Sequence, residues 1–384
     1  MLLYRHAAEC VLTGQVLQIC EIGFTYPPAF AFVMIPFALM PIGLAVFIWY
    51  LITLACTVVC CWLCEILTLR LFPEPWPERQ RVWFRSIAIF ISLKFILSVY
   101  EDQAYDLLIL PLTLFGILTL ADRRNTLAAT SLGVAAAMKV TPLIFLPYLL
   151  FKRRYAAAAI FAGALLAVSF LPDLFFKPDG AAHGYFVTWV REIAAPGLFE
   201  NAAGTKYTFW EGANPLNLSL RGLIALALDQ TAYQADFTAI LRAVQLIFMA
   251  VIGSLLLISM RWNMIPAEGA LLIIAMLMLS PMSGRGHFVG LMLTYYLLVA
   301  ALFKDRYTAW LGTLVLAVSF LLCAGIPRGV APLFITEFMR LHSDISYGTL
   351  VLIIYLATIM LFPQRWGIAR ATDSPRVATA GLQT

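Results

Sequence analysis

The sequence has few charged residues. Asp, Glu, Lys and Arg make up 12% of its 384 residues, whereas 62% are hydrophobic and the mean hydropathy is +0.88. So little charge excludes an ordinary water-soluble domain, in which about a quarter of the residues are charged. The net charge of +5 comes from short basic clusters between apolar runs, which favours membrane topology over a nucleic-acid partner. We therefore expect an all-α, multi-pass membrane protein.

Histidine is scarce too, with four in the chain. The four cysteines between positions 56 and 64 lie in one apolar run without a histidine, which makes a poor metal site; we interpret them as small packing residues. Cys10 and Cys20 can pair if their segment faces an oxidising compartment. No compact set of carboxylates or histidines demands a metal, so the sequence implies no metal and no other cofactor.

The chain also lacks a long linker, a charge block, a low-complexity run and an obvious internal repeat, so we predict one membrane domain over residues 1–384. About 20 apolar residues are needed for each helical crossing. We predict full or nearly full spans at 42–67, 86–100, 104–121, 155–172, 238–260, 267–281, 287–303, 308–326 and 346–362.

The apolar run at 126–151 is too long for one crossing and too short for two. Pro142 follows Lys139 closely, and proline both interrupts a helix and biases its predecessor away from helix. We predict two short, non-spanning helices that meet at a turn, which brings the total to about nine to eleven membrane helices.

Basic residues near the ends of the spans predict the orientation, because they favour the cytoplasmic side. The clusters are Arg79, Arg81 and Arg85; Arg123 and Arg124; Lys152, Arg153 and Arg154; Arg261; Lys304 and Arg306; and Arg365 and Arg370. All of these clusters fall on one side of the membrane if successive spans cross it in alternating directions. Residues 1–27 and 173–237 are then external loop regions, and residues 363–384 are a cytoplasmic tail.

Lys139 is the most informative charge, because a lysine in hydrocarbon is costly. At an external turn it suits a lipid-linked phosphate. Pairing with an acid such as Asp106, or snorkelling to the interface, stays open. Lys94, near the middle of its span, is expected in a buried ion pair or a water-filled cavity.

Three acids, Glu101, Asp102 and Asp106, cluster at the external mouth of two adjacent spans. Each could act as a general base, bind a cation or simply be hydrated. Asp106 lies inside the apolar run, so with Gln103 it is expected to face a polar cavity.

A short external turn runs from Ser280 to Phe288. Arg285 and His287 in this turn offer a bidentate donor and a titratable imidazole, both suited to a phosphate leaving group. An ordinary interfacial loop is the alternative.

Taken in order, these pieces resemble the polytopic glycosyltransferases of family 87, which have the GT-C fold and use polyprenyl-phosphate-linked sugars, typically mannose, as donors. The resemblance covers nearly the whole chain. It rests on Tyr4 with Ala7 and Ala8; Tyr26-Pro27-Pro28; Gln103 with Asp106; Lys139 with Pro142 and Lys152-Arg153-Arg154; Asn217, Ser219 and Leu220; and Ser280-Pro281, Ser283 and His287.

Two departures from the family pattern stand out. Gly284 replaces the usual tryptophan, and Arg285 stands where an acid is common. Family members also begin with a membrane helix followed by an external catalytic aspartate. By the resemblance, that aspartate is expected upstream of Met1, and Asp102, Asp106 and Glu101 are weaker substitutes within the chain.

The resemblance implies a glycosyltransferase of a bacterial-type cytoplasmic membrane, active on the external face. It would transfer a hexose, mannose by the family pattern, from a polyprenyl phosphate to a lipid or glycan acceptor, with inversion at the anomeric carbon. Lys139, Arg285 and His287 are expected to bind the donor phosphate, and Tyr26, Gln103 and Asn217 to line the substrate cavity. The alternatives are a transporter or flippase of a lipid-linked or anionic substrate, and a catalytically inactive relative.

Overall fold

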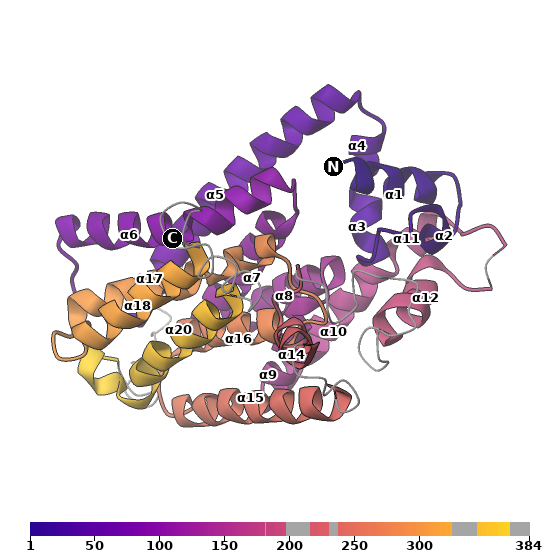
Figure 1. Cartoon of the computed structure of the whole chain (residues 1–384). Coiled ribbons are helices and arrows are strands. Elements are labelled where there is room, and N and C mark those ends of the chain that lie inside the picture. Colours follow the sequence, from indigo (N-terminus) through magenta and orange to yellow (C-terminus); the bar gives the residue numbers. More distant parts are fainter. Residues whose placement is uncertain (181, 197–215, 230–236, 325–343, 369–384) are drawn as a thin grey trace, which may run out of the picture.

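The structure is a computed structural model that describes residues 1–180, 182–196, 216–229, 237–324 and 344–368. These residues form helices joined by turns, and no strand occurs among them. Figure 1 shows a bundle of long helices with a smaller group of short helices, α1 to α4, α11 and α12, at one side. The all-α prediction is confirmed.

Each predicted span corresponds to one helix. These are α5 (Ile42–Leu71), α6 (Glu78–Glu101), α7 (Asp106–Ala121), α10 (Tyr155–Ser169), α15 (Phe237–Ser259), α16 (Ile265–Leu279), α17 (Leu291–Lys304), α18 (Ala309–Ala324) and α20 (Asp344–Leu361). Within the described residues, five segments are long and apolar enough to cross a membrane: α5, α6, α15, α20 and the stretch Arg285–Lys304. The other apolar helices are shorter, so the chain is a polytopic membrane protein with helices of unequal length.

The predicted break near Lys139 is also found. Residues 125–151 form α8 (Asn125–Met138), the short 3-10 helix η1 (Thr141–Ile144) and α9 (Phe145–Phe151). An unbroken helix would need an N–H from residue 142 to bond to the carbonyl of Met138, and Pro142 has none; its ring would also clash with that carbonyl. Lys139 takes an extended backbone instead, with φ −149° and ψ 121°.

Small residues hold α8 close to its neighbours. A Cβ on Gly116 of α7 would lie 2.5 Å from Leu132, and one on Gly133 would lie 2.5 Å from the carbonyl oxygen of Phe161 in α10. Close approach through glycine and alanine is the usual way in which membrane helices pack. The hydroxyl of Ser131 donates to the carbonyl of Leu112 at 2.7 Å and ties α8 to α7, so the end of α8 is fixed relative to the start of α7.

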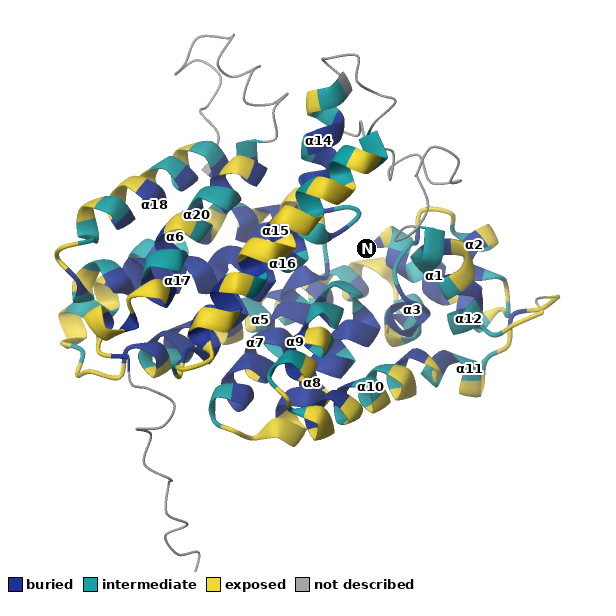
Figure 2. Ribbon diagram, turned by 90° about the horizontal axis from the view of Figure 1, so that it is seen from below, coloured by how far each residue is buried: buried dark blue, intermediate teal, exposed yellow. Residues whose placement is uncertain are grey.

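The outer faces of the long helices are apolar. Figure 2 shows α15 with a row of exposed residues along its length; they include Leu246, Ile247, Val251 and Leu257. Exposed aliphatic rows of this length suit lipid rather than water.

The two regions predicted as external loops contain short helices. Residues 1–27 hold α1 (Leu2–Leu12) and α2 (Leu17–Cys20), and a disulfide joins Cys10 to Cys20. Next come α3 (Pro28–Val33) and α4 (Ile35–Ala38). Residues 173–237 include α12 (Tyr185–Trp189), the π-helical turn η2 (Val190–Ala194) and α14 (Leu220–Asp229), and α11 (Leu171–Phe175) lies at their start.

These short helices pack on one another because each has an apolar face. Tyr4, Ala8 and Val11 of α1 are buried, and the indole of Trp189 donates to the carbonyl of Thr25 at 2.9 Å. Parts of the predicted loop, residues 197–215 and 230–236, lie outside the described residues. Of the predicted tail, the turn η6 (Pro363–Trp366) is described, and residues 369–384 lie outside.

The basic turns lie at the helix ends far from Lys139. Arg123 and Arg124 follow the last residue of α7, and the 16 residues of this helix place about 24 Å between its two ends. At the same far end, the buried carboxylate of Glu268 accepts hydrogen bonds from Lys152 at 2.7 Å, from Ser259 at 2.6 Å and from the hydroxyl of Tyr148. The polar residues therefore gather at the two ends of the bundle.

Candidate active site

Lys139 and Asp106 lie against each other. Lys139 follows the last residue of α8, and Asp106 is the first residue of the neighbouring α7. Their side chains form an ion pair, and they are 12% and 7% exposed respectively. The ammonium also lies 5.3 Å from the ring centre of Tyr105. Of the three possibilities that the sequence left open for Lys139, pairing with Asp106 is present in the structure, and phosphate binding and snorkelling stay predictions.

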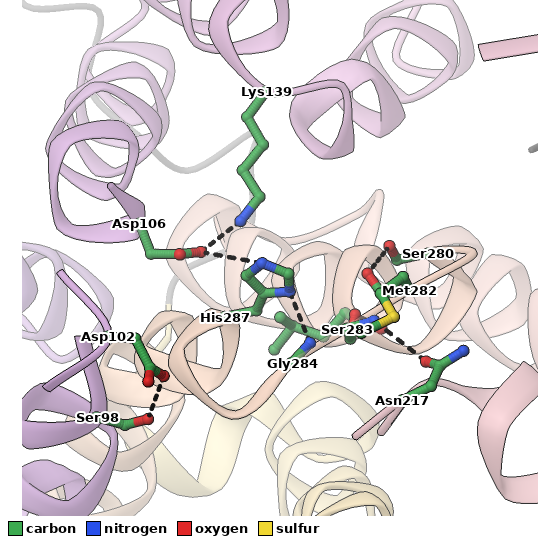
Figure 3. Close-up of polar contacts among 11 residues, drawn as sticks. Ser98, Asp102, Asp106, Lys139, Asn217, Ser280, Met282, Ser283, Gly284 and His287 are labelled. Carbon is green, nitrogen blue, oxygen red and sulfur yellow. Dashed lines mark hydrogen bonds and ion pairs between the residues drawn. The ribbon is translucent and has the colours of Figure 1, made fainter. Parts of the chain in front are cut away.

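His287 completes this group. Its Nε2 lies 3.9 Å from the carboxylate of Asp106, and Figure 3 shows the three side chains pointing toward one another. The backbone N–H of Gly284 donates to Nδ1 of His287 at 2.9 Å, so Nδ1 is an acceptor. In the neutral ring the proton therefore sits on Nε2, and the N–H of His287 is directed toward the carboxylate of Asp106.

Asn217 holds the turn that carries His287. Its amide nitrogen donates to the carbonyl of Pro281 at 2.9 Å, and its amide oxygen accepts from the backbone N–H of Ser283 at 3.2 Å. The oxygen also accepts from Ser219, through the backbone N–H at 3.2 Å and the hydroxyl at 2.8 Å. Asn217 is fully buried. The structure thus shows a residue that positions the turn, whereas its predicted place in a substrate cavity stays untested.

Three tyrosines form an aromatic wall beside Asp106. The ring of Tyr105 lies 4.8 Å from that of Tyr26 and 6.0 Å from that of Tyr4, centre to centre. Burial, together with the negative charge of Asp106, raises the pKa of Tyr26 to about 12. Tyr26 therefore keeps its phenolic proton near neutral pH and can act as a donor. The sequence pointed to Tyr4 and Tyr26 but not to Tyr105, whose only signal is its place next to Asp106.

A small cavity of about 30 Å³ lies between Asp106, Lys139 and His287. One water molecule needs a cavity of roughly 10–15 Å³, so this cavity has room for about two oxygen atoms. Its polar lining consists of Asp106, Lys139 and His287 with three hydroxyl residues, Thr113, Thr141 and Ser283; its apolar lining comes from α7, α16 and η5 (Arg285–Gly290). Two of the three predicted phosphate-binding residues, Lys139 and His287, are thus brought together.

The third, Arg285, lies elsewhere. Its side chain is exposed, and its charge acts on Lys94 and Asp344. Lys94 donates to the carbonyl of Cys323 and forms no ion pair with the residues that the structure describes, although Asp344 is near enough for its charge to be felt; the other predicted setting, a water-filled cavity, stays a prediction. Asp106 pairs with Lys139 and lies beside His287, and the described residues show no contact between Asp106 and Arg285.

The remaining candidates lie on the turn between α6 and α7. Glu101 and Asp102 are exposed, and the hydroxyl of Ser98 donates to Asp102 at 3.4 Å. Gln103 has a left-handed backbone with φ 49°, as is common after a helix end. Its amide nitrogen donates to the hydroxyl of Tyr50 at 3.2 Å, so Gln103 braces the turn against α5.

Within the described residues, one group of three potential metal ligands, His6, Cys10 and Cys20, lies close together. The two cysteines form a disulfide in this structure, so their sulfurs are not thiolates that could bind a metal.

Known proteins similar to this chain point to one family. Residues 24–282 match the model of glycosyltransferase family 87. The polyprenol-phosphate-mannose-dependent alpha-(1-2)-phosphatidylinositol pentamannoside mannosyltransferase of Mycobacterium tuberculosis (strain CDC 1551 / Oshkosh) is 26% identical over 315 residues, and the match covers 79% of this chain and 66% of that protein. The chain thus spans just under two thirds of this relative. No solved structure gives a significant match. The family match covers well over half of the residues, and this chain belongs to glycosyltransferase family 87.

Proposed function

We propose that this protein transfers mannose from a polyprenyl phosphate to a lipid or glycan acceptor on the external face of a bacterial cytoplasmic membrane. Family membership supports glycosyl transfer, and the printed name of the mycobacterial relative supports a polyprenol-phosphate-mannose donor. The observation that carries the proposal is the meeting of Lys139 and His287 at one cavity, at the end of the bundle opposite the basic turns.

The leaving group of this reaction is a lipid phosphate, which gains negative charge as the glycosidic bond breaks. Lys139 supplies a positive charge, and the Nε2–H of His287 supplies a hydrogen bond. Donors that are already in place, in a site that excludes water, stabilise such charge strongly. Asp106 neutralises Lys139 before the donor binds and is displaced from it by the incoming phosphate.

An inverting transfer also needs a carboxylate to take the proton of the acceptor hydroxyl. Within this chain, Asp106 lies between Lys139 and His287, on the side of the site where the phosphate would bind. Asp102 lies on the turn between α6 and α7 and is exposed. Its negative charge acts on the phenol groups of Tyr4 and Tyr26. Asp102 is therefore the better in-chain candidate for the base. The positive charge at the phosphate comes from side chains, so we propose that the reaction needs no divalent metal and continues in the presence of EDTA.

The test uses membranes that contain the full chain, supplied with polyprenyl phosphate carrying labelled mannose. Transfer of label to a lipid-extractable or polymeric product supports the proposal. Lys139→Ala should abolish transfer at an unchanged protein level, whereas Lys304→Ala, at the far end of α17, should leave it unchanged. Movement of label across the membrane without a new product would overturn the proposal in favour of a transporter or flippase. Equal activity from labelled glucose on the same carrier would overturn mannose as the sugar.

A further inference from the structure

Three hydroxyl groups line the cavity between Lys139 and His287, and two of them are already bonded to the protein. The hydroxyl of Thr113 donates to the carbonyl of Ile109 at 3.1 Å, within its own helix. The hydroxyl of Ser283 donates to the carbonyl of Leu277 at 2.7 Å. These two groups complete the structure of α7 and of the turn after α16, and neither has a proton left for a ligand.

Thr141 differs from both. Its hydroxyl oxygen is buried and has no hydrogen-bond partner among the described residues, although the residue lines the same cavity. Buried hydroxyl groups are nearly always bonded, and an exception calls for a specific explanation. The most direct explanation is a ligand that brings its own acceptor.

The backbone explains how Thr141 reaches the cavity. Lys139 is extended, so the chain turns after α8, and Thr141 begins η1 two residues later. Pro142, which ends α8, thereby brings an ammonium and a hydroxyl from one short segment to one cavity. His287 faces the cavity from a different element, η5, so the donors approach from two sides.

We propose that Thr141 is a third phosphate-binding residue of this site, and that its hydroxyl donates to a non-bridging oxygen of the donor phosphate beside Lys139 and His287. This inference rests on the proposed function and identifies a residue that the sequence did not single out. A phosphate oxygen is a strong acceptor, and a hydroxyl in this place needs no partner in the empty protein because the ligand supplies one. The space of about 30 Å³ suits two such oxygens and leaves the sugar outside.

The test compares Thr141→Val, which keeps the shape and removes the hydroxyl, with Thr141→Ser, which keeps the hydroxyl. Thr119→Val is the matched control, because Thr119 lies on α7 outside the cavity lining and its hydroxyl donates to the carbonyl of Phe115 in its own helix at 2.7 Å. A hydrogen bond to a charged group is worth about 10- to 100-fold in an equilibrium or rate constant. Thr141→Val should lower kcat/KM for the donor by that factor without changing the KM for the acceptor. Thr141→Ser should stay within about threefold of wild type, as should Thr119→Val.

Inhibition by the polyprenyl phosphate without its sugar gives a second measurement. Its inhibition constant should rise in Thr141→Val by about the same factor as kcat/KM falls. Equal kinetics of Thr141→Val and wild type would overturn the role of Thr141 and leave the proposed function standing. An equal loss in the valine and serine variants would also overturn it, because size rather than the hydroxyl would then matter. No transfer by the wild-type protein would instead be a failure of the proposed function.

Discussion

Lys139 forms an ion pair with Asp106, 33 residues earlier in the chain, and both side chains are largely withdrawn from solvent. The pair connects the end of α8 to the start of α7. A buried charge that loses its partner is strongly destabilising, whereas replacing both partners by neutral groups is often tolerated. The pair thus keeps a cation in place for the phosphate, and Asp106 compensates the charge of that cation while the site is empty.

The first prediction concerns this pair. Asp106→Asn should lower the free energy of unfolding by about 3–5 kcal/mol, because Lys139 is left uncompensated. Adding Lys139→Met should recover most of the loss. Asp102→Asn, at an exposed position on the preceding turn, is the control and should change stability little. Thermal unfolding of the detergent-solubilised wild type and the three variants measures these differences. If the double variant is no more stable than Asp106→Asn, the pair does not hold the two helices together.

The second prediction follows from the tautomer of His287. The Nδ1 atom accepts from Gly284, so the donor is Nε2–H. Glutamine can place an N–H close to the position of Nε2, whereas asparagine reproduces only the Nδ1 side. His287→Asn should lower kcat by about 100-fold, the usual effect of losing one donor to a developing charge, and His287→Gln should retain clearly more activity. Steady-state transfer rates measure this difference, and the reverse order would show that Nδ1 is the group that matters.

The third prediction concerns Asn217, which fixes the turn before His287. Asn217→Ala leaves the N–H of Ser283 and the carbonyl of Pro281 without their partners, at about 1–3 kcal/mol for each buried group. Activity should fall further than stability alone explains, because His287 is carried by that turn. Asn125→Ala is the matched control: Asn125 is exposed and accepts a hydrogen bond from Arg154 at 2.8 Å. Unfolding and transfer assays on both variants separate the loss of stability from the loss of activity. If Asn217→Ala and Asn125→Ala lose the same activity, Asn217 does not position His287.

The sequence was sufficient for the long helices of the bundle and for the break after α8, but not for the short helices in the two predicted loop regions. Span length and apolar character are local properties, and Pro142 interrupts the hydrogen-bond pattern of a helix wherever it stands. The convergence of Lys139 and His287 followed from topology, because both lie at turns on the same side of an alternating chain. The external position of that side remains a prediction.

The contacts across helices could not be read in this way. Asn217 meets Pro281 across 64 positions, and which side chains meet depends on helix rotation and on close contacts such as Gly116 against Leu132. Arg285 shows the same limit. It is two residues from His287, yet its charge acts on Lys94 and Asp344. Thr141 was passed over because an unbonded hydroxyl is visible only once its surroundings are known.

The last prediction concerns the other end of the bundle. The carboxylate of Glu268 is fully buried and accepts from Lys152, Ser259 and Tyr148. Glu268 is an isolated acid in an apolar run, which was a signal that it has a partner, since such a charge is costly alone in a membrane. Glu268→Gln leaves the buried ammonium of Lys152 without its counter-charge, so the free energy of unfolding should fall by about 3–5 kcal/mol.

The control is Glu78→Gln. Glu78 is exposed and pairs with Arg81, also partly exposed, at 3.5 Å, and an exposed pair contributes at most about 1 kcal/mol. Glu268 lies at the start of α16, and the turn with Ser283 and His287 follows the end of that helix. At a temperature where Glu268→Gln is still folded, it should therefore keep the wild-type KM for the donor. A raised donor KM in a stably folded Glu268→Gln protein would mean that this cluster belongs to the substrate site, and that the two ends of the bundle do not have separate roles.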